Sequence, residues 1–138
     1  IEHLLSALHA YKISNLLIKS NAEIPIFDGS ALEFCRAIED AGIEEQGGEW
    51  FEIAIDREYT FEPKPGSRER ITLSPAPELQ IQYDLHYPAP IGSQSYTLTG
   101  IENFRKEISS ARTFGFLKDI GALQKAGLAA GGRLDNFI

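Results

Sequence analysis

The sequence has no methionine, one cysteine and one tryptophan, and these scarcities limit what the protein can be. Because Cys35 has no second cysteine to pair with, an internal disulfide is excluded, and we expect a reducing compartment, the cytoplasm. Without methionine there is no initiator residue, and the first residues already follow a helical pattern with no N-cap residue ahead of them. We therefore expect an internal fragment of a longer protein, truncated at both ends.

Long apolar runs and excess positive charge are lacking as well. No run approaches the roughly 20 apolar residues that span a bilayer, and no signal-peptide pattern opens the chain. Lys and Arg number 13 against 20 Asp and Glu, which gives a formal net charge of −7. Nucleic-acid binding depends on neutralising phosphates, so this balance argues against a nucleic-acid partner. What remains is 138 residues, 43% of them hydrophobic, enough for one domain or for parts of two small ones.

The apolar periodicity predicts two helices in the first third of the chain, over 1–11 and from about 31 to 41. Strands or extended segments are predicted between them, over 13–19 and 22–27. Ser30 and Glu33 match the S-x-x-E capping box of the second helix, and Gly42 is a suitable C-cap. Gln46-Gly47-Gly48 then breaks the pattern and marks a boundary or linker.

Strands dominate the pattern after this break. They are predicted over 50–61, 70–73, 79–86 and 95–98. A helix is predicted next, from Thr99 to about Ser109, with Glu102 completing a capping box. It is followed by an extended segment over 111–116, a helix over 119–126 and a strand after Gly132. Because strands cluster before their helices, the class is α+β rather than a doubly wound sheet.

Glu2 and His3 are the first candidate site. An imidazole can hold zinc, and a neighbouring carboxylate can take a proton from zinc-bound water. A structural His at a helix edge, beside a Glu that the helix dipole favours, is the commoner interpretation of such a dipeptide. The H-E-x-x-H signature is absent, and His9 lies roughly 240° around the helix from His3. Catalytic zinc usually takes three protein ligands, so this chain supplies at most one convincing ligand.

The run Ala111-Arg112-Thr113-Phe114-Gly115-Phe116 is the second candidate. A Thr hydroxyl at a strand end can donate to a developing oxyanion, and an Arg can meet a phosphate. The alternative is an ordinary half-buried strand.

Other features have structural interpretations beside functional ones. Gly131-Gly132 could let a ligand approach the backbone or could form a turn. The set Leu117, Ile120, Leu123 and Leu128 could line an apolar channel or cover the core of its own helix. Cys35 falls within a helix without a basic neighbour, which indicates an inert packing residue.

Seven runs in register, covering almost the whole chain, resemble the zinc-dependent UDP-3-O-acyl-N-acetylglucosamine deacetylases of bacterial lipid A synthesis. The runs are Glu2-His3-Leu4-Leu5-Ser6-Ala7-Leu8, Ile13-Ser14-Asn15-Leu16, Glu23-Ile24-Pro25-Ile26-Phe27-Asp28-Gly29-Ser30-Ala31, Ala41-Gly42-Ile43, Ile91-Gly92-Ser93-Gln94, Ala111-Arg112-Thr113-Phe114-Gly115-Phe116, and Gly127-Leu128 through Gly131-Gly132 to Asp135-Asn136.

The resemblance implies two α+β domains, two-layer α/β sandwiches of the ribosomal S5 domain 2-like type, packed face to face with the active site between them. Residues 1–47 would be the C-terminal part of the first domain. Residues 48–138 would be the N-terminal part of the second, with 117–138 in an insert that lines the passage for the acyl chain. Both domains would be incomplete.

The resemblance also implies the reaction and its residues. The enzyme hydrolyses the N-acetyl group of a UDP-sugar that carries a fatty acyl chain, and releases acetate in the committed step toward lipid A. His3 matches one zinc ligand, Glu2 the general base and Thr113 the hydroxyl at the oxyanion. The substrate-binding positions are Phe114, Phe116, Leu117, Ile120 and Gly132. The other two ligands, from a His-Lys-x-x-Asp motif, and the general acid, a later His, would lie beyond Ile138, so we expect the chain to be inactive alone.

Some positions depart from the family pattern. Arg133 and Phe137 stand where smaller residues are common, which puts the accepted acyl length in doubt. Tyr87 replaces a common His before the Pro, so His86 inherits no role. We expect a monomer; the alternatives are a non-catalytic α+β binding or scaffold module, and a parent protein with a fused dehydratase domain.

Overall fold

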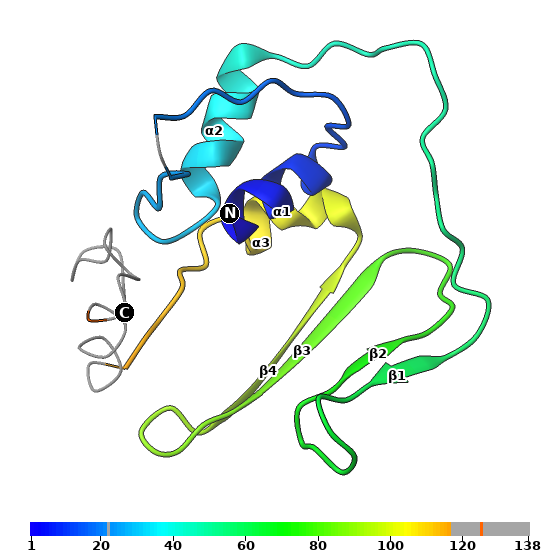
Figure 1. Cartoon of the computed structure of the whole chain (residues 1–138), viewed down its shortest axis with the longest axis vertical. Helices are drawn as coiled ribbons and strands as arrows, with labels where there is room; N and C mark the ends of the chain where they lie inside the picture. The colour runs from blue at the N-terminus through cyan, green and yellow to red at the C-terminus, as the bar shows by residue number, and fades with distance from the viewer. Residues whose placement is uncertain (22, 117–124, 126–138) are drawn as a thin grey trace. The chain divides into compact units, whose positions relative to one another are not determined.

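The computed structural model of the chain describes residues 1–21, 23–116 and 125. Its elements are α-helices and small antiparallel sheets, so the class is α+β, as predicted. The chain divides into a first unit, which holds residues 1–46 and those from Glu102 on, and a second unit over 47–101. The α-helices belong to the first unit and the strands to the second (Figure 1).

The first unit is built around two helices, α1 (Glu2–Ala10) and α2 (Leu32–Ala41), with a short third helix, α3 (Phe104–Glu107), behind a 3-10 turn, η1 (Ile101–Asn103). The buried apolar side chains of this unit are Leu4, Ala7, Ala31, Phe34, Cys35 and Phe104. Ala7 and Cys35 are fully buried, and such small side chains allow helices to approach closely. The core is therefore small and is contributed by all three helices.

Helix α1 ends as helices commonly do, although without a glycine. Lys12 adopts a positive φ of 55°, and the backbone N–H of Ile13 donates to the carbonyl of Leu8 at 2.9 Å. This 6→1 bond belongs to the Schellman motif. The chain then continues without regular structure to residue 21, so the predicted strand over 13–19 was wrong. Of the two predictions for 22–27, a strand or an extended arm, the strand is not formed by the described residues 23–27. Apolar alternation there meets no pairing strand among the described residues.

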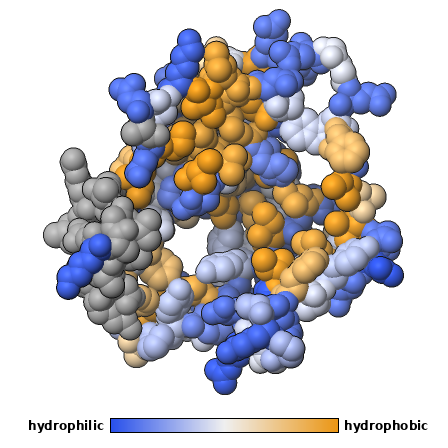
Figure 2. Space-filling view, in the orientation of Figure 1, coloured by the Kyte–Doolittle hydropathy of each residue, from blue (hydrophilic) through white to orange (hydrophobic). Residues whose placement is uncertain are grey.

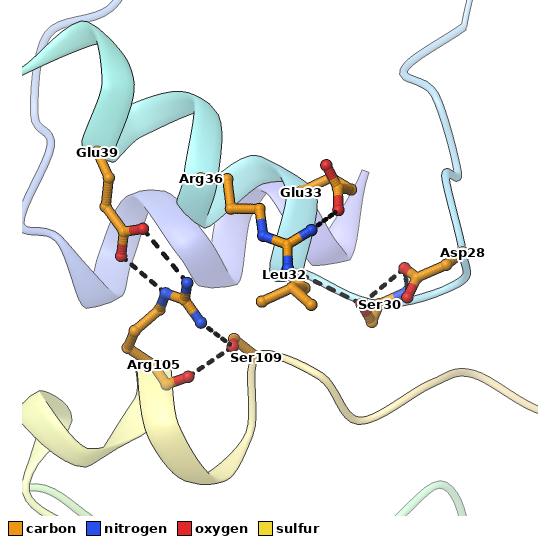
Figure 3. Close-up of polar contacts among 8 residues, drawn as sticks. All are labelled: Asp28, Ser30, Leu32, Glu33, Arg36, Glu39, Arg105 and Ser109. Carbon is orange, nitrogen blue, oxygen red and sulfur yellow. Dashed lines mark hydrogen bonds and ion pairs between the residues drawn. The ribbon is translucent and has the colours of Figure 1, made fainter.

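Helix α2 begins where the sequence predicted, but without the predicted capping box. Ser30 Oγ accepts a bond from the N–H of Leu32 at 3.2 Å and donates one to Asp28 Oδ1 at 2.7 Å (Figure 3). Glu33 instead pairs with Arg36 one turn along the helix. The C-terminal prediction was confirmed, since Gly42 follows the helix with a φ of 77°.

The second unit consists of two antiparallel hairpins. Strand β1 (Tyr59–Phe61) pairs with β2 (Ile71–Leu73), with Tyr59 opposite Leu73. Strand β3 (Gln80–His86) pairs with β4 (Ser93–Thr99), with Gln80 opposite Thr99. The predicted strands at 70–73, 79–86 and 95–98 are thus confirmed, whereas the one over 50–61 is reduced to three residues.

The predicted helix from Thr99 is also shorter than expected. Thr99 ends β4, and its hydroxyl accepts a bond from Gln80 Nε2 at 3.3 Å rather than capping a helix. Gly100 turns the chain with a φ of 73°, and α3 begins only at Phe104. The predicted helix over 119–126 and the strand after Gly132 lie outside the described residues, apart from Lys125. The boundary between the units falls at Gln46–Gly47, but the assignment of 1–47 and 48–138 to two domains stays a prediction.

Both units expose large apolar side chains. Leu17 in the first unit is 78% exposed and Phe51 in the second is 85% exposed. Figure 2 shows hydrophobic residues in orange on the visible face, beside hydrophilic ones in blue. Within the described part of the chain, no helix combines the length and apolar character needed to cross a bilayer.

Candidate active site

Glu2 and His3 occupy the first turn of α1, where a carboxylate is favoured by the helix dipole. The Glu2 side chain is exposed, and a hydrogen bond from its own backbone N–H is the main cause that lowers the pKa of its carboxyl. The group is therefore ionised at neutral pH, as a general base must be.

His3 is half-buried between exposed Glu2 and buried Leu4. Its carbonyl accepts a bond from Ser6 Oγ at 2.8 Å. Within residues 1–21, 23–116 and 125, no hydrogen bond reaches either ring nitrogen of His3, so the imidazole is available to a ligand. No group of three or more His, Cys, Asp or Glu side chains that could hold a metal occurs in the same residues. His3 is thus a single donor.

Thr113 lies in the segment after α3, which has no regular secondary structure, and two bonds fix that segment to a distant turn. The N–H of Thr113 donates to the carbonyl of Gly29 at 2.8 Å, and Arg112 Nε donates to the carbonyl of Asp28 at 2.6 Å. The Thr113 side chain is half-buried, and its hydroxyl makes no hydrogen bond to any described residue. The segment predicted to be extended over 111–116 is therefore a tethered loop, and the Thr113 hydroxyl has no hydrogen-bond partner among the described residues.

The turn that receives this loop is itself rigidly held. Asp28 Oδ1 accepts bonds from the backbone N–H of Ser30 at 3.1 Å and from its hydroxyl at 2.7 Å (Figure 3). The hydroxyl bond is the main cause that lowers the pKa of the Asp28 carboxyl. Gly29, with a φ of 88°, and Ser30 are buried. The sequence singled out both the turn and the Arg112-Thr113 run, but nothing in it indicated that they touch across more than 80 positions.

A polar network joins α2 to α3 and was missed entirely from the sequence. Arg105 donates through Nε to Glu39 Oε1 at 2.7 Å and through Nη2 to Oε2 at 3.3 Å (Figure 3). Arg105 Nη1 also reaches Ser109 Oγ at 3.3 Å. The hydrogen bond from the Arg105 guanidinium lowers the pKa of the Glu39 carboxyl. The hydroxyl of Tyr11 also donates to Glu39 and lowers the same pKa further. Burial, followed by the bond to Glu39, raises the pKa of Tyr11 to about 12.

The aromatic candidates lie beyond Thr113. Phe114 is 37% exposed, and its ring meets that of Phe116 edge to face, with centroids 6.1 Å apart. Leu117, Ile120 and Gly132 lie outside the described residues. No described hydrogen bond or ion pair joins Glu2 or His3 to Thr113, so the structure fixes each candidate within its own segment.

Comparison with known proteins identifies relatives of the whole chain. The family model described as LpxC, UDP-3-O-acyl N-acetylglycosamine deacetylase, matches residues 1–138. The UDP-3-O-acyl-N-acetylglucosamine deacetylase of Campylobacter fetus subsp. fetus is 42% identical over 141 aligned positions, which cover 100% of this chain and 47% of that protein. Proteins of the same name from Aliarcobacter butzleri and Nitratiruptor sp. are 40% and 43% identical, with 46% of each covered. The chain therefore spans about half the length of the curated relatives it matches.

Proposed function

Because the chain belongs to the UDP-3-O-acyl N-acetylglycosamine deacetylase family, we propose that it is part of an enzyme that hydrolyses the N-acetyl group of UDP-3-O-acyl-N-acetylglucosamine. Water attacks the acetamide carbonyl, the C–N bond breaks, and acetate and the free amine of the sugar are released. The observation that carries the proposal is the placement of Glu2 and His3 side by side in the first turn of α1, in a chain that matches the family over its whole length.

We assign zinc as the metal, and His3 fits one of its ligand positions. The imidazole is half-buried and has no described hydrogen-bond partner, which suits a neutral nitrogen donor. Zinc bound there would lower the pKa of a water and polarise the acetamide carbonyl. The family's other ligands come from a His-Lys-x-x-Asp motif that the printed sequence does not contain, so this chain supplies only part of the site.

Glu2 and Thr113 act in the same step, Glu2 on the attacking water and Thr113 on the carbonyl oxygen. The Glu2 carboxylate accepts the proton of the attacking water, which it can do because it is ionised. The Thr113 hydroxyl donates to the carbonyl oxygen as negative charge develops on it, and its freedom from other described partners supports this role. Phe114 packs near the sugar, Phe116 also binds the substrate, and Leu117, Ile120 and Gly132 are assigned to the apolar passage for the acyl chain.

The remaining assignments rest on the resemblance. We propose that the whole protein folds as two S5 domain 2-like sandwiches, divided near residue 47 of this chain, with 117–138 in an insert of the second. It would act as a monomer in the cytoplasm, with the UDP-sugar as its partner and without nucleic acid.

The test is deacetylation by the whole protein of which this chain is part. Purified with zinc and supplied with UDP-3-O-acyl-N-acetylglucosamine, it should release acetate and a free amine, whereas Glu2→Ala should retain zinc without turnover. A protein that binds the UDP-sugar but releases no acetate would instead be the binding module.

A further inference from the structure

Thr113 can donate to an oxyanion only if its backbone is held still, yet it lies in a loop outside any helix or strand. A flexible loop would misplace the hydroxyl, and a misplacement of about 1 Å can cost roughly 10²-fold in rate. The structure provides two restraints at consecutive residues, both directed to the turn over Asp28–Ser30.

Of these two bonds, only the one from Arg112 is made by a side chain, so it can be removed by substitution. The Arg112 Nε donates to the carbonyl of Asp28 at 2.6 Å, next to the Gly29 carbonyl that takes the Thr113 N–H at 2.8 Å. The Arg112 charge also contributes to the lowered pKa of the Asp28 carboxyl, after the hydrogen bonds from Ser30. The bond commits the Arg112 Nε to the turn, whereas the residue type alone suggests a contact with a substrate phosphate.

The acceptor turn is fixed independently of Arg112. Asp28 binds both the N–H and the hydroxyl of Ser30, and Ser30 Oγ accepts the N–H of Leu32 at the start of α2. These bonds hold the turn to the start of α2. A loop that is hydrogen-bonded to the turn is therefore held in place relative to this helix.

We infer that Arg112 is a positioning residue for Thr113: it ties the loop to the Asp28–Gly29 carbonyls so that the Thr113 hydroxyl keeps a fixed place in the site. The inference rests on the proposed deacetylase function for its kinetic consequence, but its structural core concerns the 138-residue chain alone. A direct phosphate contact by Arg112 predicts a raised KM, whereas positioning predicts a lowered kcat.

The structural test is amide hydrogen exchange at Thr113 in the 138-residue chain, followed by NMR. Arg112→Ala should accelerate exchange at Thr113 by tenfold or more, which is about 1.4 kcal/mol. Arg112→Lys keeps the charge without the planar Nε donor and should have an intermediate effect, and it serves where Arg112→Ala does not fold. Arg36→Ala is the matched control, because Arg36 pairs with Glu33 on α2 and should leave Thr113 unchanged. Equal exchange in wild type and both Arg112 variants would overturn the inference.

The kinetic test is a double-mutant cycle in the whole protein. Thr113→Val should lower kcat by about 10²–10³-fold and Arg112→Ala by about 10–10²-fold with KM within about twofold. In the Thr113→Val background, Arg112→Ala should cost little more. Fully additive losses, or a raised KM with unchanged kcat, would refute positioning. If the wild-type protein releases no acetate while Thr113 exchange still depends on Arg112, the proposed function fails and the tether stands.

Discussion

Replacement of Phe34 by Ala tests whether the small helical core holds the first unit together. Phe34 is 8% exposed and lies next to Cys35, which is fully buried and is the only cysteine in the chain. Burial raises the pKa of the Cys35 thiol. A thiol that is buried and protonated reacts with a disulfide reagent only when the surrounding packing opens, so its rate of labelling measures that opening.

The magnitude follows from the packing of Phe34. Truncation of a buried Phe to Ala typically costs 3–5 kcal/mol. The Phe34 ring also meets Phe27 edge to face at 4.9 Å, and such a pair contributes about 0.5–1.5 kcal/mol beyond its buried area. Because Phe27 is itself 44% exposed, we take the low end, about 3 kcal/mol. At about 1.4 kcal/mol per tenfold change, the open population should rise roughly 10²-fold.

The assay is the reaction of Cys35 with an aromatic disulfide at pH 8, followed by absorbance and referenced to the rate in denaturant. Phe34→Ala should label roughly 10²-fold faster than wild type. Phe114→Ala is the control, since Phe114 lies in the loop after α3 at 37% exposure and should leave the rate unchanged. If Phe34→Ala labels at the wild-type rate, the thiol is reached without opening of the helices, and the core has been assigned wrongly.

Other predictions address the site and its supports. In the whole protein, Glu2→Ala should lower kcat by several orders of magnitude with zinc retained, whereas His3→Ala should lose zinc, as metal analysis would show; near-normal turnover of Glu2→Ala would remove the base assignment. The isolated 138-residue chain, supplied with zinc and substrate, should release no acetate, and clear turnover would show that the ligands have been misplaced. The pKa of Asp28 is lowered in the fold from its ordinary 3.8, so its carboxylate stabilises the chain above that pH, and this contribution is lost as pH falls through the folded pKa. The urea midpoint of unfolding should therefore fall less between pH 6 and pH 3 in Asp28→Asn than in wild type. An equal fall in both proteins would show that the Asp28 carboxylate does not stabilise the fold.

Elements that local signals specify were predicted well. Helix α1 has a sustained apolar face, and α2 is followed by a glycine at a positive φ. Strands β3 and β4 are close in sequence and pair over seven positions. The failures were segments such as 13–19 and 50–58, where apolar alternation was present. A strand needs a partner as well as a pattern, and single-sequence periodicity carries no information about the partner.

The site was predictable only in its residue types. Glu2, His3 and Thr113 came from chemistry and resemblance, and their roles stay predictions. The contact of Arg112 with the Asp28 turn and the bond between Arg105 and Glu39 join residues 84 and 66 positions apart. Polar partners at such separations depend on how the helices and loops pack, and no local spacing rule anticipates them.

The exposure of the Glu2 side chain bears on its proposed role as a general base. A general base works best with a pKa near the working pH, which carboxylates reach through burial. Here the pKa of Glu2 is instead lowered, chiefly by a hydrogen bond from its own backbone N–H. On the proposed function, further protein surface must cover the first turn of α1, both to raise this pKa and to complete the zinc ligands.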